Sequence, residues 1–136
     1  MISYADWAQS VLHSRIPHEI AMKRVSATRF ASVLQAIGPP HGPRLEILRA
    51  HYAAPGRAAT AIALAERVGF KRNIGINVSY GRLAKQIGML IGVQNPNLSL
   101  LFEVVRPTTA TSREWILVMR PEFADGLKRA GWIEEQ

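Results

Sequence analysis

Residues 60–88 read TAIALAERVGFKRNIGINVSYGRLAKQIG, and this stretch decides the fold that the sequence predicts. Thr60 suits the N-cap of a short helix, because its hydroxyl can accept a hydrogen bond from a backbone N–H of the first turn. This helix is expected to end at Gly69, and the FKRN run at 70–73 predicts a basic turn. A second helix is expected from about Ile76 to 88. Two helices joined by a turn are typical of a helix-turn-helix.

The second helix of this stretch is expected to have an inner and an outer side. Apolar residues at inward spacing are Ile76, Val78, Leu83 and Ile87. The residues left for solvent or a ligand are Asn77, Ser79, Arg82, Lys85 and Gln86. Small residues along both helices favour a close crossing, and they are Ala61, Ala63, Ala65, Gly69, Gly81 and Ala84.

Two more helices are expected before this pair. The first runs from about Ser26 to Ile37 and is stopped by the GPP sequence at 38–40. The second begins at Pro43, which suits the first turn of a helix, and is broken by the APG sequence at 54–56. Nearer the N-terminus, Ser3 and Asp6 form a capping-box pattern for a helix that Pro17 ends.

Beyond Pro96 the apolar pattern changes from helical to strand-like. Residues 98–105 and 114–119 are rich in strand-forming side chains, and the polar residues 106–113 between them predict an exposed hairpin loop. Pro121 then begins a last helix that ends at Gly131, with Trp132 and the next residue folding back against it.

Together these elements predict an α+β, mostly helical protein. We expect a winged helix-turn-helix, three helices plus a β-hairpin wing, over residues 41–136, which include a C-terminal helix. Residues 1–40 are expected to form an N-terminal helical extension. The role of the extension stays open at this stage, because its apolar residues can form a homodimer interface or pack onto the rest of the chain. These residues are Trp7, Val11, Leu12 and Phe30.

The charge of the chain is strongly positive and unevenly distributed. The 136 residues include 17 Lys+Arg and 10 Asp+Glu, and the net charge is +7. No acidic residue occurs between Glu66 and Glu103, whereas that window holds Arg67, Lys71, Arg72, Arg82 and Lys85. A stretch of one sign favours a polyanionic partner. The lack of cysteine, of a signal-peptide pattern and of a long apolar run favours a cytoplasmic protein outside the membrane.

These features predict a site for duplex DNA on the second helix. Asn77 and Arg82 can make bidentate contacts with adenine and guanine. Residues expected to contact phosphates or flank the reading positions are Lys71, Arg72, Asn73, Ser79 and Lys85. Tyr80 has two equal interpretations, a hydrogen bond to a phosphate or packing in the helix crossing. Arg106 and Arg113 flank the expected wing loop.

No pattern in the sequence indicates an enzyme. The histidines at 13, 18, 41 and 51 are dispersed and lack metal-ligand spacing, and no nucleophile elbow or phosphate-binding glycine loop is present. We therefore expect no catalytic residue, no metal and no cofactor.

Several separated blocks of the sequence resemble a known family. They are HYAAPGR at 51–57, Thr60 with LA at 64–65 and VGF at 68–70, Asn77 with YGRLA at 80–84, WILVMRPE at 115–122 and GW at 131–132. Over roughly residues 44–133 the chain resembles winged-helix DNA-binding modules that occur alone or fused to HNH-type endonucleases in bacterial restriction systems. The resemblance implies DNA reading, sensitive in some members to base methylation. The HNH metal motif is missing here, so cleavage is not expected.

Three functions follow as hypotheses. The first is sequence- or modification-dependent binding of duplex DNA without catalysis, linked to restriction or to transcriptional regulation. The second is a protein-interaction module that serves a nuclease or methylase partner, because fold alone does not decide function. The third is RNA binding, which competition between duplex DNA and duplex RNA would distinguish.

Overall fold

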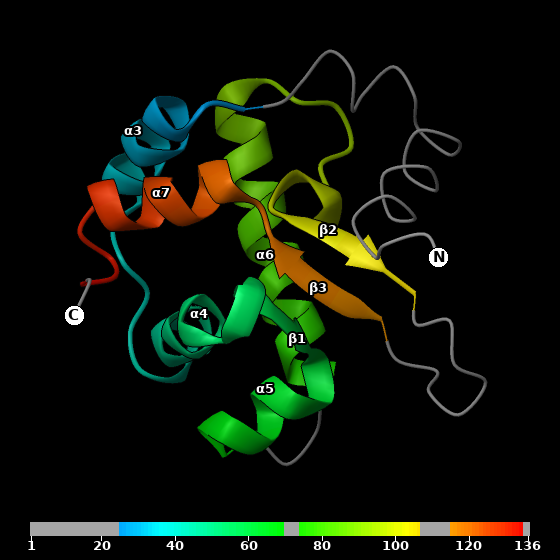
Figure 1. Ribbon diagram of the computed structural model, residues 1–136. Helices are drawn as coiled ribbons and strands as arrows, with labels where there is room; N and C mark the ends of the chain where they lie inside the picture. The colour runs from blue at the N-terminus through cyan, green and yellow to red at the C-terminus, as the bar shows by residue number, and fades with distance from the viewer. Residues whose placement is uncertain (1–24, 70–73, 107–114, 135–136) are drawn as a thin grey trace.

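The protein was analysed as a computed structural model, which describes residues 25–69, 74–106 and 115–134. Five helices and a three-stranded antiparallel sheet lie within these ranges, so the mostly helical α+β class is confirmed. The helices are α3 (Ala27–Ile37), α4 (Pro43–Ala53), α5 (Ala61–Val68), α6 (Ile74–Ile91) and α7 (Pro121–Arg129). The strands are β1 (Ala58–Thr60), β2 (Phe102–Val105) and β3 (Ile116–Met119). Figure 1 shows α3 beside α7, and the sheet between α7 and the α4–α5 pair.

The sheet has the order β1-β3-β2, so its last strand lies in the middle. Strands β2 and β3 form the expected hairpin, with Phe102 opposite Met119 and Val105 opposite Ile116. Strand β1 was not predicted from the sequence. Its residues Ala58-Ala59-Thr60 pair with the other edge of β3, and three small or polar residues carry no alternating pattern that could have indicated a strand.

The helix boundaries follow the signals that the sequence carries. The Ser26 side chain accepts a hydrogen bond from the Arg29 N–H at the start of α3, and Thr60 does the same for Ala63 in α5, both at 3.1 Å. Gly69 ends α5 in the left-handed conformation with φ of 81°, as expected of a C-cap glycine. Helix α6 is longer than predicted: it has 18 residues and extends the expected range by two residues before Ile76 and by three residues after Gly88.

Helices α3 and α7 pack closely because Gly126 lies at their contact. A Cβ atom at this position would lie 2.6 Å from the Cβ atom of Phe30, which is closer than side chains pack. Phe30 in turn meets Phe123 edge to face, with ring centroids 5.4 Å apart. The described part of the N-terminal segment therefore packs onto the rest of the chain through Phe30. The other apolar residues proposed for a dimer interface, Trp7, Val11 and Leu12, lie outside the described residues.

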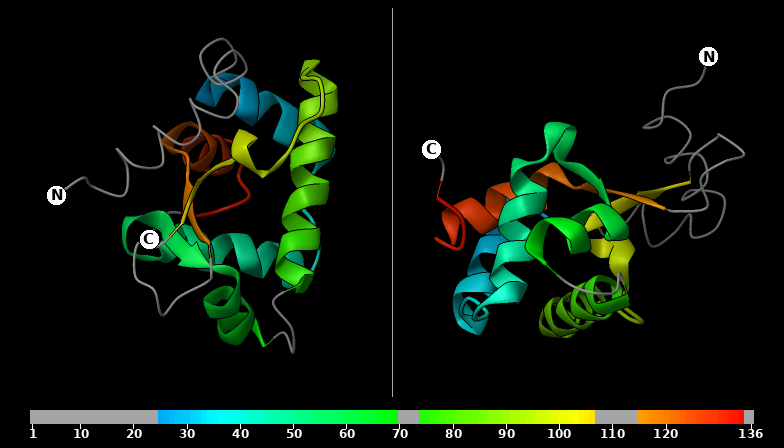
Figure 2. Two further views of the ribbon diagram at one scale, coloured as in Figure 1. Left: turned by 90° about the vertical axis from the view of Figure 1, so that its right-hand side faces the viewer. Right: turned by 90° about the horizontal axis from the view of Figure 1, so that it is seen from below.

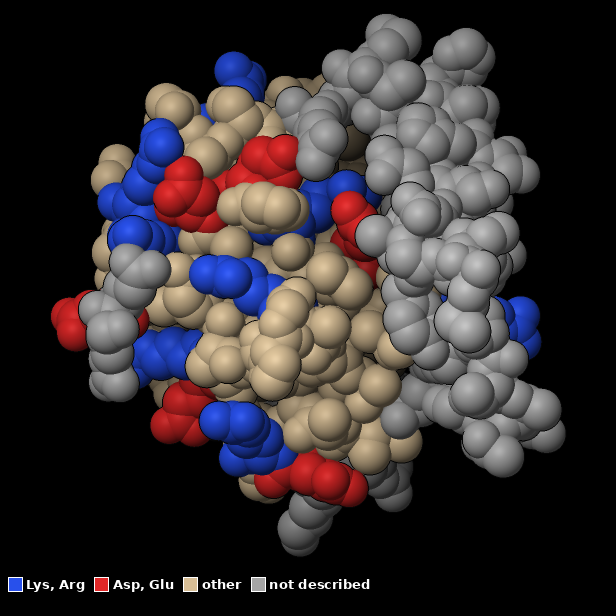
Figure 3. All heavy atoms as spheres, viewed as in Figure 1, with Lys and Arg blue, Asp and Glu red and all other residues tan. Residues whose placement is uncertain are grey.

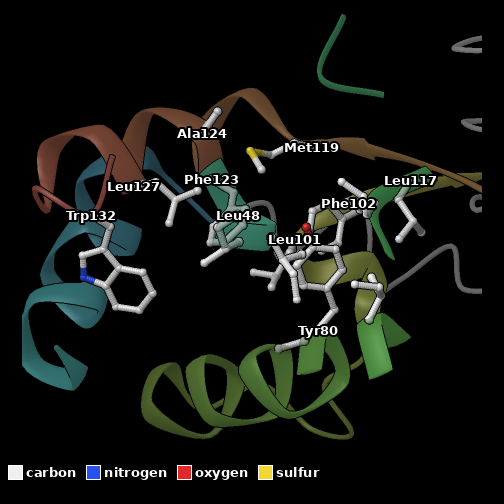
Figure 4. Close-up of a cluster of buried hydrophobic side chains, with 14 of the residues drawn as sticks. Leu48, Tyr80, Leu101, Phe102, Leu117, Met119, Phe123, Ala124, Leu127 and Trp132 are labelled. Carbon is white, nitrogen blue, oxygen red and sulfur yellow. The ribbon is translucent and has the colours of Figure 1, made fainter. Parts of the chain in front are cut away.

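The hydrophobic core lies between α6, the sheet and the remaining helices (Figure 4). Helix α6 contributes Ile76, Tyr80, Ala84 and Ile87, whose spacing of four, four and three residues places them on one side of the helix. Trp132 and Ile133 are buried at the end of α7, where the Trp132 backbone N–H donates to the Leu127 carbonyl at 3.0 Å. This confirms the expected hydrophobic stop behind Gly131.

Two expectations about the helix pair were wrong. Val78 was expected to face inward, but 45% of it is exposed, because it lies two residues, or about 200° around the helix, from the buried Ile76. The small residues do not all serve the helix crossing either. Ala63 and Gly69 are exposed, and nothing lies within 4 Å of a Cβ atom placed on Gly81.

None of the helices in the described ranges is both long and apolar enough to cross a membrane.

Candidate nucleic-acid interface

The outer side of α6 carries exposed polar side chains, together with the exposed apolar Val78, Met89 and Leu90. Asn77, Arg82, Lys85 and Gln86 are all exposed on it, as the sequence predicted for the reading helix. In both views of Figure 2, α6 lies at one edge of the molecule, with the sheet and the other helices on its inner side. A helix held at the edge of a fold in this way can enter a groove without rearrangement of its neighbours. We call this surface the outer face of α6.

The two cations of the outer face have no counter-charge within the described part of the chain. Arg82 and Lys85 are three residues apart and are therefore neighbours on the helix surface. Neither forms an ion pair with any carboxylate in residues 25–69, 74–106 or 115–134. Adjacent like charges destabilise an isolated helix slightly, and binding of an anion would relieve that repulsion.

The opposite side of the molecule carries both signs of charge. Figure 3 shows this side, with Lys and Arg side chains interspersed with Asp and Glu side chains. Elsewhere in the described ranges, Arg129 pairs with Asp125 at 3.0 Å and Arg120 approaches Glu103 at 3.9 Å. These two arginines therefore have a carboxylate partner among the described residues, whereas Arg82 and Lys85 have none there. This difference makes the outer face of α6 the better candidate for a polyanion.

Gly81 lies in the middle of the outer face and has no structural explanation there. Glycine within a helix costs up to about 1 kcal/mol relative to alanine. Two other helical glycines, Gly88 and Gly126, are each packed against a neighbouring residue, Pro96 and Phe30. Gly81 has nothing within 4 Å of an added Cβ atom. Because Gly81 has no side chain and no described atom lies close to it, a ligand can approach the helix backbone at this position.

Tyr80 does not belong to the outer face. Only 1% of it is exposed, so it cannot contact a phosphate. The other interpretation, packing in the helix crossing, holds only in that Tyr80 is packed inside, where it meets His51 of α4 and Phe102 of β2. The reason is its position four residues after the buried Ile76, which places both on the inner side of α6. Ser79 is partly exposed and lies beside it, on the wall of a pocket behind the helix.

A buried histidine connects α6 to the sheet. His51 of α4 is fully buried, with its Nδ1 atom 2.7 Å from the Tyr80 hydroxyl and its Nε2 atom 2.8 Å from the Leu117 carbonyl oxygen. A carbonyl can only accept, so Nε2 carries the proton and Nδ1 accepts from the Tyr80 hydroxyl. The imidazole also stacks on the Phe102 ring, with centroids 5.0 Å apart. The sequence indicated only that His51 lacks metal-ligand spacing, and no spacing signal linked it to Tyr80 or Leu117.

Burial fixes the ionisation state of this pair. Removal from water lowers the pKa of His51 below 6.5, more than its backbone hydrogen bonds raise it. Burial also raises the pKa of Tyr80 well above 10. The imidazole is therefore neutral and the phenol is protonated at neutral pH, which is the state that both hydrogen bonds require.

The loop end of the β2–β3 hairpin presents a further cation, away from α6. Arg106 is exposed and lies over the ring of Trp115, with its guanidinium carbon 5.8 Å from the ring centroid. Arg106 follows Val105 and Trp115 precedes Ile116, the last register pair before the connecting loop, so the two residues lie at the loop end of the hairpin. The stacked ring limits where the guanidinium can point. The predicted DNA site included Arg106 but not Trp115, whose ring holds the guanidinium.

Four predicted site residues cannot be placed. Lys71, Arg72 and Asn73 in the turn before α6, and Arg113 in the wing loop, lie outside the described residues. Among the described residues, no group of three or more His, Cys, Asp or Glu side chains could hold a metal ion.

Comparison of the chain with protein-family models, with curated proteins and with solved structures found no match.

Proposed function

We propose that this protein binds duplex DNA without catalysing a reaction, and that α6 is its reading helix. The observation that carries the proposal is the outer face of α6, where Asn77, Arg82 and Lys85 are exposed and neither cation has a carboxylate partner among the described residues. Asn and Arg are the side chains that read adenine and guanine by paired hydrogen bonds, and Lys suits phosphate contact.

The arrangement of the elements supports a winged helix-turn-helix as the scaffold of this site. Helices α4, α5 and α6 come before the β2–β3 hairpin, and β1 between α4 and α5 completes a sheet of order β1-β3-β2. In this scaffold the third helix lies in the major groove and the hairpin loop follows the neighbouring backbone. Arg106, which lies over the Trp115 ring at the loop end of the hairpin, would make that second contact.

The dimensions of α6 suit a major groove. Its 18 residues give a length of about 27 Å, and the groove of B-DNA, about 12 Å wide, admits one α-helix. Gly81 at the centre of the outer face would allow the helix backbone to approach base edges or a phosphate closely. Val78, exposed beside Asn77, can contact the methyl group of thymine or of a methylated base. Such a contact would make the binding sensitive to base modification, as in restriction or transcriptional regulation.

The direct test is binding of a short duplex of random sequence, measured by fluorescence anisotropy at several salt concentrations. Each neutralised phosphate contributes about −0.9 to the slope of log K against log salt, so Lys85 and Arg106, the two cations proposed to contact phosphates, together predict a slope of about −2 or steeper. A flat salt dependence, or equal affinity for duplex RNA, would contradict the proposal. Selection from random duplexes in methylated and unmethylated pools would then identify the preferred site.

A protein partner is the second candidate, and one observation favours it. The outer face becomes apolar toward the end of α6, where Met89 is 68% and Leu90 is 58% exposed. If the function is to bind a nuclease or methylase subunit through these residues, the protein itself should show no steep salt dependence in the duplex-binding assay. Substitution of both by serine separates the two functions, since DNA affinity should persist if only the polar part of the face reads DNA.

Replacement of Gly81 by alanine is expected to stabilise the protein and weaken DNA binding. Alanine is favoured over glycine in a helix by about 0.5–1 kcal/mol, and the added methyl meets no atom of the chain within 4 Å. The same methyl would hold the helix away from the DNA. Thermal unfolding and anisotropy titration of the one variant measure both effects. If the variant is more stable and binds duplex DNA as tightly as the wild type, the helix backbone does not approach the ligand at Gly81.

A further inference from the structure

The His51 side chain of α4 connects the inner side of α6 to the sheet. Its imidazole accepts from the Tyr80 hydroxyl of α6, donates to the Leu117 carbonyl of β3 and stacks on the Phe102 ring of β2. Figure 4 shows Tyr80 pointing from α6 toward Phe102, and the centroids of these two rings are 4.5 Å apart. A change at the imidazole therefore acts directly on the side of α6 that packs in the core.

The hydrogen bonds of this cluster fit only the neutral imidazole. Nδ1 has to accept from the Tyr80 hydroxyl, because the one proton of the neutral ring is on Nε2 and goes to the Leu117 carbonyl oxygen. A proton added to Nδ1 would meet the hydroxyl hydrogen. If the hydroxyl turned to accept from Nδ1–H, its own hydrogen would have no acceptor among the described residues, where His51 is its one hydrogen-bond partner.

No carboxylate among the described residues pairs with the imidazole. Strand β3 has no ionisable side chain. In β2, Glu103 follows Phe102 and so lies on the opposite side of the strand, where it approaches Arg120. On α6, Tyr80 faces the ring with a neutral phenol, whereas the cations of that helix lie on its outer face. The charged residues of α4 and of the adjoining α5 are exposed, and they are Arg44, Glu46, Arg49, Glu66 and Arg67.

The turn before β1 brings the backbone of Arg57 to the same ring. Burial lowers the pKa of His51 below 6.5, and the backbone hydrogen bonds with Leu117 and Arg57 raise it by less. The Arg57 guanidinium lies over the Tyr52 ring, 4.3 Å from its centroid, and has the same sign of charge as a protonated imidazole. The surroundings of His51 therefore oppose a second proton on the ring.

We propose that His51 is an acid-sensitive latch on α6. Uptake of one proton from water at Nδ1 breaks the hydrogen bond from the Tyr80 hydroxyl, leaves a buried charge without a counter-ion and releases the inner side of α6. The latch is a property of the fold and can be tested without DNA. Its consequence for DNA, a loss of affinity in acid, rests on the proposed function.

Urea unfolding between pH 5 and 8 tests the latch on the wild type, His51→Gln and His41→Gln. The unfolded histidine takes up its proton near pH 6.5 and the folded one only at lower pH, so the stability that the latch contributes is complete above pH 6.5 and is lost below it. Relative to His51→Gln, the unfolding constant of the wild type is expected to rise by up to about tenfold for each pH unit below 6.5. Glutamine does not titrate, yet it offers an amide donor for the Leu117 carbonyl. His41→Gln removes an exposed histidine and should keep the profile of the wild type.

The ¹⁵N chemical shifts of the His51 ring in the wild type give a second readout, which does not require that a variant folds. With the ring assigned through its own backbone, Nε2 is expected to be protonated and Nδ1 unprotonated at and above pH 6.5. The proposal is overturned if the wild type and His51→Gln have parallel unfolding profiles. It is also overturned if Nδ1 carries the proton of the neutral ring, or if the folded ring takes up its second proton at pH 6.5 or above.

Duplex binding at pH 7.5 and 5.5 separates the latch from the proposed function. If neither the wild type nor His51→Gln binds duplex DNA at pH 7.5, the proposed function is wrong, while the unfolding profiles still decide the latch. If both bind, the wild type is expected to lose affinity at pH 5.5 relative to His51→Gln, as α6 is released. Equal losses in the two proteins would mean that the latch does not control the reading helix.

Discussion

Arg82→Ala is expected to weaken binding of the preferred duplex by about 1–3 kcal/mol and to relax the base preference. The loss corresponds to a dissociation constant roughly ten- to 150-fold higher. The reason is that Arg82 is exposed at the centre of the outer face of α6, next to Lys85, and is free of an ion pair with any described carboxylate. Its guanidinium is therefore available for the paired hydrogen bonds that read guanine.

The measurement combines anisotropy titration with selection from a random duplex library, for the wild type and the variant. Arg49→Ala is the matched control, because Arg49 is also an exposed helical arginine but belongs to α4. Both variants should unfold within about 0.5 kcal/mol of the wild type, as is usual for exposed residues without partners. If Arg82→Ala and Arg49→Ala have the same affinity and preference, α6 is not the reading helix.

The sequence predicted the helices well where local chemistry determines them. Ser26, Thr60 and Gly69 act within one turn of the backbone, so their capping roles can be recognised from neighbouring residues alone. The same holds for the exposure of Asn77 and Arg82, since polar residues opposite an apolar stripe face outward in most helices.

Features that depend on contacts between residues far apart in the sequence could not be predicted from neighbouring residues. Val78 was misplaced because its apolar character was given more weight than its angle to Ile76, while Tyr80 took the inward position. His51 bonds to residues 29 and 66 positions away in sequence, and neither distance leaves a local pattern. Gly81 could be assigned to the helix crossing or to a ligand only after its surroundings were known.

The largest effect on stability is expected from His51→Ala, which should lower the free energy of unfolding by about 3–5 kcal/mol. The change leaves the Tyr80 hydroxyl and the Leu117 carbonyl buried without their partner, and each such group costs about 1–3 kcal/mol. It also leaves a cavity beside Phe102, where the imidazole stacks. Urea unfolding at a pH well above 6.5, where the histidine is neutral in both states, measures the loss.

Comparison with two other variants separates the hydrogen bonds from general effects of the substitution. His41→Ala removes an exposed histidine and should change stability by no more than about 0.5 kcal/mol. Tyr80→Phe removes only the hydroxyl and should cost about 1–3 kcal/mol, and its loss should not add fully to that of His51→Ala, because both remove the same bond. Full additivity would mean that the two side chains are not coupled.

Tyr80→Phe should also reduce DNA affinity, although Tyr80 does not belong to the outer face. The reason is that its hydrogen bond to His51 joins α4 to the inner side of α6, so its loss would hold the reading helix less firmly.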